Sequence, residues 1–143
     1  MLYELYSYIM THLDKISRTP EYFKSSKCVV KALLSDSHLA VSSELEVFDA
    51  AIRWINFDRT SRLKYLAEIM NIIRFTQMRP DELVCKVENS CYFSDSFEFQ
   101  KMVYNAYKFH ALNHVKNNFN GIVHKEESRN FCLKGILAIL VII

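Results

Sequence analysis

Apolar residues recur every three or four positions along most of this chain, and polar residues occupy the positions between them. That spacing places the apolar side chains on one face of an α-helix. It predicts helices over residues 2–16, 28–34, 43–55, 63–73 and 95–110, and two short helices that open at Pro20 and Pro80. The chain has only 2 Gly and 2 Pro, too few for the turns of a β-sandwich or a propeller. We therefore expect an all-α fold, an antiparallel stack of short helix hairpins.

The segment 43–55 has the clearest pattern. Ser43 and Glu46 have the spacing of a capping box, in which each side chain satisfies a free backbone amide at the start of a helix. Phe48 and Trp54 fall on the apolar half of this helix, and we expect both in the core. Truncating a buried residue such as Trp54 to alanine typically costs about 3–5 kcal/mol.

Glu44 departs from this pattern, because its carboxylate falls on the apolar half of the same helix. A buried carboxylate needs a cationic or amide partner. Arg74 ends the apolar run of the next predicted helix, and its guanidinium can satisfy a carboxylate with two parallel hydrogen bonds. We predict a structural Glu44–Arg74 ion pair rather than a catalytic acid. Arg74→Ala would then unfold the chain, at a cost of about 3–5 kcal/mol.

The first predicted helix has an apolar stripe that starts at once, with no capping residue before it. The stripe consists of Leu2, Leu5, Tyr6, Ile9 and Leu13. The helix therefore looks cut into rather than started, and we expect these side chains to form a partner surface. An exposed stripe of this kind also predicts marginal stability and self-association.

We expect three regions along the chain. Residues 1–112 form the helical domain, 113–130 form a polar and basic linker, and 131–143 form an apolar tail. The tail ends in a run of branched apolar residues that suits a buried strand. It is shorter than the roughly 20 residues that span a bilayer. A membrane anchor over 131–143 is therefore the weaker alternative, and Lys134 also interrupts it.

Charge and cysteine content narrow the possible partners. The net charge of +2 is too small to indicate a nucleic acid or a membrane surface. The 4 Cys show no C-x-x-C spacing, so the chain has neither a zinc motif nor a redox motif. Free thiols are typical of a reducing compartment, the cytoplasm or the nucleus. The first residues lack a basic region, so no secretory signal is expected.

Two groups of residues are candidates for chemistry. His110 and His114 have the i, i+4 spacing of a metal clip, but the segment HALNH lacks the glutamate of H-E-x-x-H. Cys85 or Cys91 could pair with His110 as thiolate and imidazole, yet nothing supplies the third group that orients such a pair. We predict no catalytic site, no metal and no cofactor. A small Cys/His enzyme stays as a minor alternative.

The order of these elements resembles the BACK domain, the helical region between the BTB domain and the propeller of kelch-like proteins. The most specific part is LLSDSHLAVSSELEVFDAAIRWI at 33–55, followed by RLKYLAEIMNIIRF at 62–75. Weaker matches lie at residues 2–17, 21–26, 78–90 and 104–110. The resemblance covers residues 2–112.

The resemblance implies a role, because kelch-like proteins are substrate adaptors of cullin–RING ubiquitin ligases. It implies a non-catalytic spacer and protein-interaction module acting in ubiquitin-dependent degradation. Cullin and substrate contacts belong to the BTB domain and the propeller in that family. We expect the first BACK helix to precede Met1 and residues 131–143 to match a truncated propeller strand, which makes the chain an incomplete form. The alternative is a stand-alone helical interaction protein unrelated to ubiquitination.

Overall fold

The computed structural model describes residues 1–118, and this part of the chain is built from helices and contains no β-strand. The predicted all-α class is therefore confirmed for the described residues. They divide into two compact units, Met1–Ile73 and a second unit that begins at Arg74. The predicted strand or anchor at 131–143, and most of the predicted linker, lie outside the described residues.

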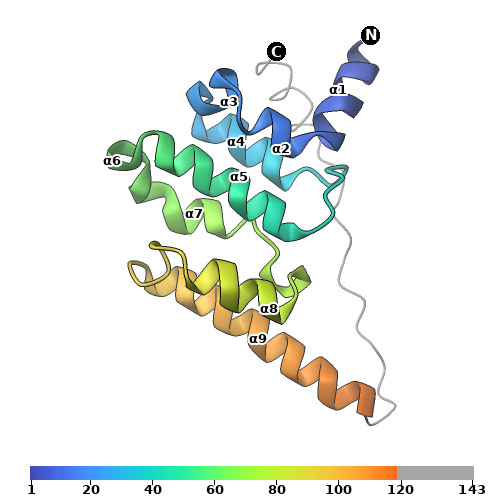
Figure 1. The fold of residues 1–143 in the computed structure, drawn as a ribbon, viewed down its shortest axis with the longest axis vertical. Coiled ribbons are helices and arrows are strands. Elements are labelled where there is room, and N and C mark those ends of the chain that lie inside the picture. The colour runs from blue at the N-terminus through green and yellow to red at the C-terminus, as the bar shows by residue number, and fades with distance from the viewer. Residues whose placement is uncertain (119–143) are drawn as a thin grey trace. The chain divides into compact units, whose positions relative to one another are not determined.

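The first unit is a stack of short helices connected by tight turns. Its elements are α1 (Leu2–Thr11), α2 (Leu13–Ile16), α3 (Pro20–Lys24), α4 (Lys27–Ser35), α5 (Glu44–Phe57), α6 (Arg59–Arg62), the 3₁₀ turn η1 (Leu63–Tyr65) and α7 (Leu66–Met70). Helix α5 lies at the centre and contacts α2, α3, α4 and α7. Figure 1 shows α4, α5 and α7 side by side, each running opposite to the one before it. This is the predicted antiparallel stack.

The core of the first unit follows the apolar stripe of α5. Val47, Phe48, Ala51, Trp54 and Ile55 are all at most 3% exposed. Helices α4 and α7 present their own apolar faces to it, with Val30, Leu33, Leu34, Leu66, Ile69 and Met70 buried. Burying each large side chain of this kind contributes about 1.5–3 kcal/mol. The spacing of three and four along these segments therefore decides which residues form the core.

The prediction of one helix over residues 2–16 is wrong, because the helix breaks at His12. His12 has φ −128° and ψ 39°, outside the helical region. Its ring atom Nδ1 lies 2.9 Å from the Tyr8 carbonyl oxygen, the acceptor that its own amide would use in a continuous α-helix. The His12 amide instead makes a long bond of 3.4 Å to the Ile9 carbonyl. A side chain that competes with the backbone thus separates α1 from α2.

Two further boundaries differ from the sequence prediction. The stretch between the helices predicted over 43–55 and 63–73 contains the short helix α6, which Asp58 caps by accepting from the amide of Ser61. The segment predicted as one helix over 63–73 starts as the 3₁₀ turn η1, and the α-helical part, α7, ends at Met70. Short polar segments of this kind have no apolar periodicity from which their secondary structure could be predicted.

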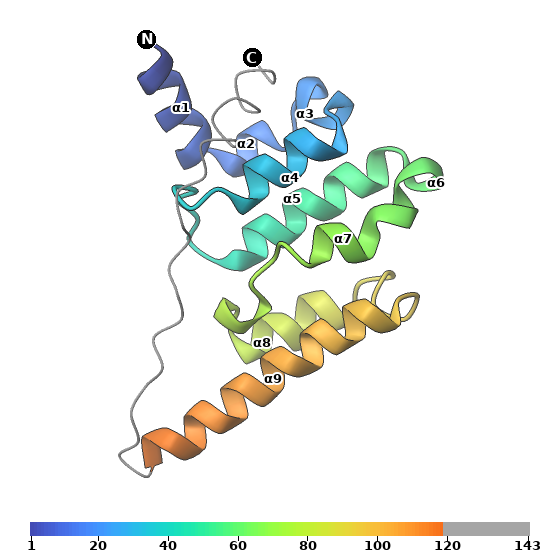
Figure 2. The same cartoon turned by 180° about the vertical axis from the view of Figure 1, so that it is seen from behind.

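The second unit is a helix hairpin. It contains η2 (Phe75–Gln77), α8 (Pro80–Glu82), the π-helical segment η3 (Leu83–Glu88) and α9 (Phe97–Asn118). Helix α8 and η3 form one arm and α9 the other, and the two lie side by side in Figure 1 and in the reverse view of Figure 2. The buried residues between them are Phe75, Met78, Leu83, Val87, Tyr92, Phe99, Val103 and Ala106.

Both arms of this hairpin begin with a cap. The Glu82 carboxylate accepts from the backbone amide of Arg79, and Pro80 occupies the first helical turn as predicted. Helix α9 is capped by Ser96, whose hydroxyl accepts from the amide of Phe99 at 3.2 Å. Helix α9 continues to Asn118, so the first residues of the stretch expected as linker from 113 onward are helical.

Candidate functional site

Helix α1 carries the stripe that the sequence suggests as a partner surface. Along this stripe the exposed fraction falls from 65% at Leu2 to 2% at Ile9 and 2% at Leu13, and Leu5 and Tyr6 between them are half-buried. Ile9 and Leu13 therefore belong to the core and are not available to a partner. The accessible part of the stripe is its N-terminal end.

The exposed end of α1 is apolar beyond the predicted residues. Tyr3 is 81% exposed, and it adjoins Leu2 on the first turn of the helix. No side chain caps this turn, and the Leu5 amide bonds to the Met1 carbonyl at 3.1 Å. We call Leu2, Tyr3, Leu5 and Tyr6 the α1 surface. Large apolar groups grouped in this way are typical of a site that another element covers.

A buried aspartate fixes the lower part of α1 to the loop that follows α4. Asp36 is 2% exposed, and the Tyr6 hydroxyl lies 3.1 Å from each of its carboxylate oxygens. The backbone amide of His38 donates to the same carboxylate at 2.8 Å. Burial and the neighbouring carboxylate raise the pKa of Tyr6 to about 12. The Ala40 amide also donates to the Met10 carbonyl at 2.8 Å, so two polar contacts hold α1 against this loop.

The start of α5 places the residues of the predicted capping box. Ser43 is the N-cap residue, and its hydroxyl accepts from the amide of Leu45 at 3.1 Å rather than from the amide three residues on. The Glu46 carboxylate accepts from the amide and the hydroxyl of Ser42, one residue before the expected donor. Both side chains still satisfy polar groups at the helix start.

Glu44 is buried as its sequence position suggests, with 5% of its surface exposed. Arg74 lies at the start of the second unit, next to η2, and is half-buried. The proposed pairing of the two residues joins different units, so it stays a prediction. Their burial fits structural roles better than a catalytic acid, which must reach its substrate.

Trp54 is the centre of a contact network that joins α3, α5 and α6. Its indole nitrogen donates to the Ser25 carbonyl at 2.9 Å, and its side chain is 2% exposed. The Arg62 guanidinium lies 4.1 Å from the centroid of the indole ring, a cation–π contact. Arg62 also donates to the carbonyl oxygens of Trp54 and Phe23, each at 2.7 Å. Burial lowers the pKa of Arg62. Trp54 is therefore a structural residue rather than an open stacking platform.

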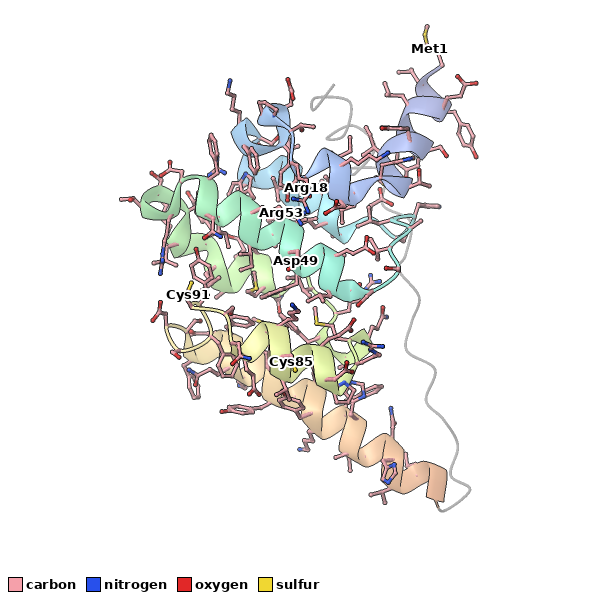
Figure 3. All side chains as sticks on the ribbon, viewed as in Figure 1. Met1, Arg18, Asp49, Arg53, Cys85 and Cys91 are labelled. Carbon is pink, nitrogen blue, oxygen red and sulfur yellow. The ribbon has the colours of Figure 1, made fainter. Side chains whose placement is uncertain are left out.

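A second charged network ties α2 to α5. Arg18 and Arg53 each donate to the Asp14 carboxylate at 3.0 Å, and Arg53 donates to the Ser17 hydroxyl at 2.7 Å. Figure 3 shows Arg18, Arg53 and Asp49 gathered on this face. The hydrogen bond from Arg18, with the charges of both arginines, holds the pKa of Asp14 below its usual range. The network is largely exposed, so its charges are screened by solvent.

His110, which belongs to both candidate pairs of the second unit, contacts a backbone carbonyl. The Nε2 atom of His110 lies 2.8 Å from the Met78 carbonyl oxygen, so this ring serves to hold α9 against the start of the hairpin. Cys85 and Cys91 are exposed free thiols (Figure 3). His114 lies within α9 and is exposed. Among residues 1–118, no group of three or more His, Cys, Asp or Glu side chains could hold a metal ion.

Sequence reasoning missed two residues that organise the first unit, and the hydrogen-bond partner of a third. Asp36 and Arg62 have no apolar period or motif that singles them out, and the pattern places Tyr22 inward on its helix without giving its partner. Tyr22 is fully buried, and its hydroxyl donates to the Ala50 carbonyl at 2.8 Å. Each role depends on groups at least eight residues away. The polar run Ser35–Ser37 indicated a loop around Asp36, but it did not indicate that this aspartate is buried. A buried aspartate is favoured where its carboxylate accepts from several backbone or hydroxyl donors.

Comparison with known proteins identifies the family of this chain. The sequence model of the family described as BACK, "BTB And C-terminal Kelch", matches residues 2–88. This chain belongs to the BACK domain family. The chain is 30% identical to Kelch-like protein 3 of Homo sapiens over 112 residues, which are 78% of this chain and 19% of the relative. It is 30% identical to Kelch-like protein 7 of Gallus gallus over 105 residues, 73% of this chain and 18% of the relative.

The predicted resemblance to kelch-like proteins is thus confirmed. The chain spans about a fifth of the length of the curated relatives it matches, 19% for Kelch-like protein 3. The BACK match includes all helices of the first unit and ends with η3, so α9 lies beyond it. Within the described part of the chain, none of the helices combines the length and apolar character needed to cross a membrane.

Proposed function

We propose that this chain is a non-catalytic helical spacer and protein-interaction module of a kelch-like substrate adaptor in cullin–RING ubiquitin ligases. The observation that carries the proposal is the BACK match over residues 2–88, together with a first unit whose helices form one packed stack. A stack of this kind can hold a fixed distance between the domains at its two ends. The proposed place of action is the cytoplasm, with the nucleus as a second compartment.

Three features of the side chains support a structural rather than a catalytic role. Glu44 is buried, Trp54 is covered by Arg62, and His110 is bonded to a backbone carbonyl. We infer that the residues that could have formed an acid, a stacking platform or a thiol–imidazole pair hold helices together instead. We propose protein partners, with a cullin and a substrate bound through the other domains of the complete adaptor.

The α1 surface is the proposed junction with the preceding part of the adaptor. Its residues Leu2 and Tyr3 are apolar and open to solvent, whereas the stripe below them is packed. A neighbouring helix that covered Leu2, Leu5 and Tyr6 would continue the same stack. Covering this turn would also remove an exposed apolar patch.

A domain exchange tests the proposal. The BACK segment of Kelch-like protein 3 is replaced by the matching residues of this chain, and cullin binding and substrate ubiquitination are measured for the chimera. We expect both activities to be retained, because a spacer of equivalent fold keeps the spacing of the two ends. A second chimera carrying Leu2→Asp and Tyr3→Asp, both at exposed positions, serves as the matched control and should lose activity. A folded first chimera that binds substrate but not the cullin would contradict the proposal.

A further inference from the structure

Helix α9 is apolar on two opposite faces. The inner face packs into the second unit through Phe99, Val103 and Ala106, each 0% exposed. Along the opposite side runs a second stripe with the spacing 4, 3, 4, 4, 3, which is the period of an α-helix. We call it the outer face of α9, and it consists of Phe97, Lys101, Tyr104, Lys108, Leu112 and Val115.

The outer face is open to solvent along its whole length. Phe97 is 75% exposed, Tyr104 58%, Leu112 50% and Val115 51%. A surface helix normally presents charged and polar residues on the side that faces water. Four large apolar side chains in one helical row therefore mark a face that binds another molecule. The Tyr104 ring also meets Phe93 edge-on, with ring centroids 6.3 Å apart, which orients the tyrosine for contact.

The charges on this face define the partner. Lys101 and Lys108 are both exposed and form no ion pair or hydrogen bond with any residue in the described part of the chain. They lie seven positions apart, about 10.5 Å along the helix axis. The outer face itself carries no acidic residue. It thus presents two unmatched positive charges between apolar side chains.

The two lysines disfavour the binding of a second copy of this chain to the outer face of α9. Pairing two outer faces would place lysines against lysines with no carboxylate on either stripe to offset them, and facing like charges destabilise a helix pair. A helix with carboxylates at the matching spacing would instead neutralise both lysines. Electrostatic complementarity of this kind sets partner choice, and the apolar row supplies most of the binding free energy.

We propose that the outer face of α9 binds an acidic amphipathic helix of a partner protein. The partner helix carries apolar residues at intervals of three and four, and Asp or Glu residues seven positions apart that meet Lys101 and Lys108. The proposed site can be tested apart from the adaptor role, because its residues lie on α9 and none of them belongs to the α1 surface. Helix-in-groove and helix-on-helix recognition commonly use this pattern of apolar anchors.

The test uses the full chain and two synthetic helical peptides. Both peptides share one apolar stripe, and they differ in the residues at the seven-residue spacing, which are Glu in one and Lys in the other. Binding is followed by fluorescence anisotropy at low and high salt. We expect the Glu peptide to bind about tenfold more tightly than the Lys peptide, with the difference reduced at high salt.

A charge exchange provides the decisive variant. The double variant Lys101→Glu/Lys108→Glu should reverse the preference and bind the Lys peptide more tightly. The matched control Lys15→Glu/Lys24→Glu changes the net charge by the same amount on exposed lysines of the first unit and should keep the original preference. Tyr104→Ser should weaken both peptides. Circular dichroism confirms that each variant retains its helix content.

Four results would overturn the proposal. One is equal binding of both peptides in all variants, and another is no binding of either peptide. A third is concentration-dependent self-association that Tyr104→Ser abolishes, because the face would then be occupied by a second copy. The last is binding to vesicles that contain phosphatidylserine, lost in the Lys101→Glu/Lys108→Glu variant, with no binding to the Glu peptide. That result would make the face a membrane surface.

Discussion

The guanidinium of Arg62 lies over the Trp54 indole at 4.1 Å and also donates to the Trp54 carbonyl oxygen. One side chain thus covers the ring and satisfies a backbone acceptor in the last turn of α5. Its other terminal nitrogen bonds to the Phe23 carbonyl in α3. The ends of two helices are therefore fixed by a single residue from a third, α6.

Removing the Arg62 guanidinium should destabilise the first unit. Arg62→Met keeps most of the apolar stem and loses both hydrogen bonds and the cation–π contact. We expect the free energy of unfolding to fall by about 1.5–3 kcal/mol, the usual range for hydrogen bonds to a charged group. Urea denaturation followed by circular dichroism measures it. Arg18→Met is the control, because this arginine makes an exposed ion pair worth at most about 1 kcal/mol. Equal losses in both variants would contradict the assigned role of Arg62.

Asp36 should be more sensitive than an exposed aspartate. Asp36→Ala removes the acceptor of the Tyr6 hydroxyl and of the His38 amide, and the acceptor itself is buried. We expect a loss of about 1.5–3 kcal/mol in the free energy of unfolding. Asp36→Asn should lose less, since an amide oxygen still accepts. Asp81→Ala, at an exposed position, provides the comparison and should change stability little. Thermal unfolding of the three variants distinguishes these outcomes.

Ionisation of the Tyr6 hydroxyl should lower the free energy of unfolding at high pH. Its pKa is raised from 10.0 to about 12, so the folded chain holds this proton more tightly than the unfolded chain. The corresponding stabilisation is fully present below pH 10 and is lost as the pH rises through about 12. Burial raises the pKa of Tyr22 as well, in the same direction.

Urea titrations at several pH values between neutral and strongly alkaline measure this dependence. The Tyr6→Phe variant isolates the contribution of Tyr6, because it keeps the ring and removes the titrating group. We expect its stability to fall less steeply above pH 10 than that of the parent chain. Parallel curves for the two proteins would show that Tyr6 ionises in the folded state without penalty.

The exposed turn of α1 predicts self-association. Leu2 and Tyr3 are 65% and 81% exposed, and their burial between copies would remove apolar surface from water. Leu2→Ser/Tyr3→Ser should shift the chain toward the monomer in sedimentation velocity at several concentrations. Its free energy of unfolding should stay nearly constant, since neither side chain is packed. Val84→Ser, at another exposed apolar position, controls for general surface effects. A parent chain that stays monomeric at every concentration would refute the prediction.

Much of the helix order was predictable because local spacing and packing agree. The segment 43–55 has an apolar stripe of helical period, and the same residues form the centre of the first unit. The break at His12 was not predictable from that stripe, because it depends on whether an imidazole or an amide takes the Tyr8 carbonyl. The spacing of apolar residues gives no information on which of these two groups bonds to the carbonyl. The accessible part of the α1 stripe could be identified only from the exposed fraction of each side chain in the fold. Leu2 and Ile9 share this stripe but differ in exposure.

The order and spacing of residue types were enough to predict the all-α class, the core stripe of α5 and the BACK resemblance. The partners of single polar side chains follow only from the packed fold. Tyr6 meets Asp36 thirty residues away, and Arg62 meets Phe23 thirty-nine residues away. Such pairs form only when packed helices bring distant segments together. A hydrogen bond requires its donor and acceptor to lie about 3 Å apart, and the separation of two residues along the sequence does not predict that distance.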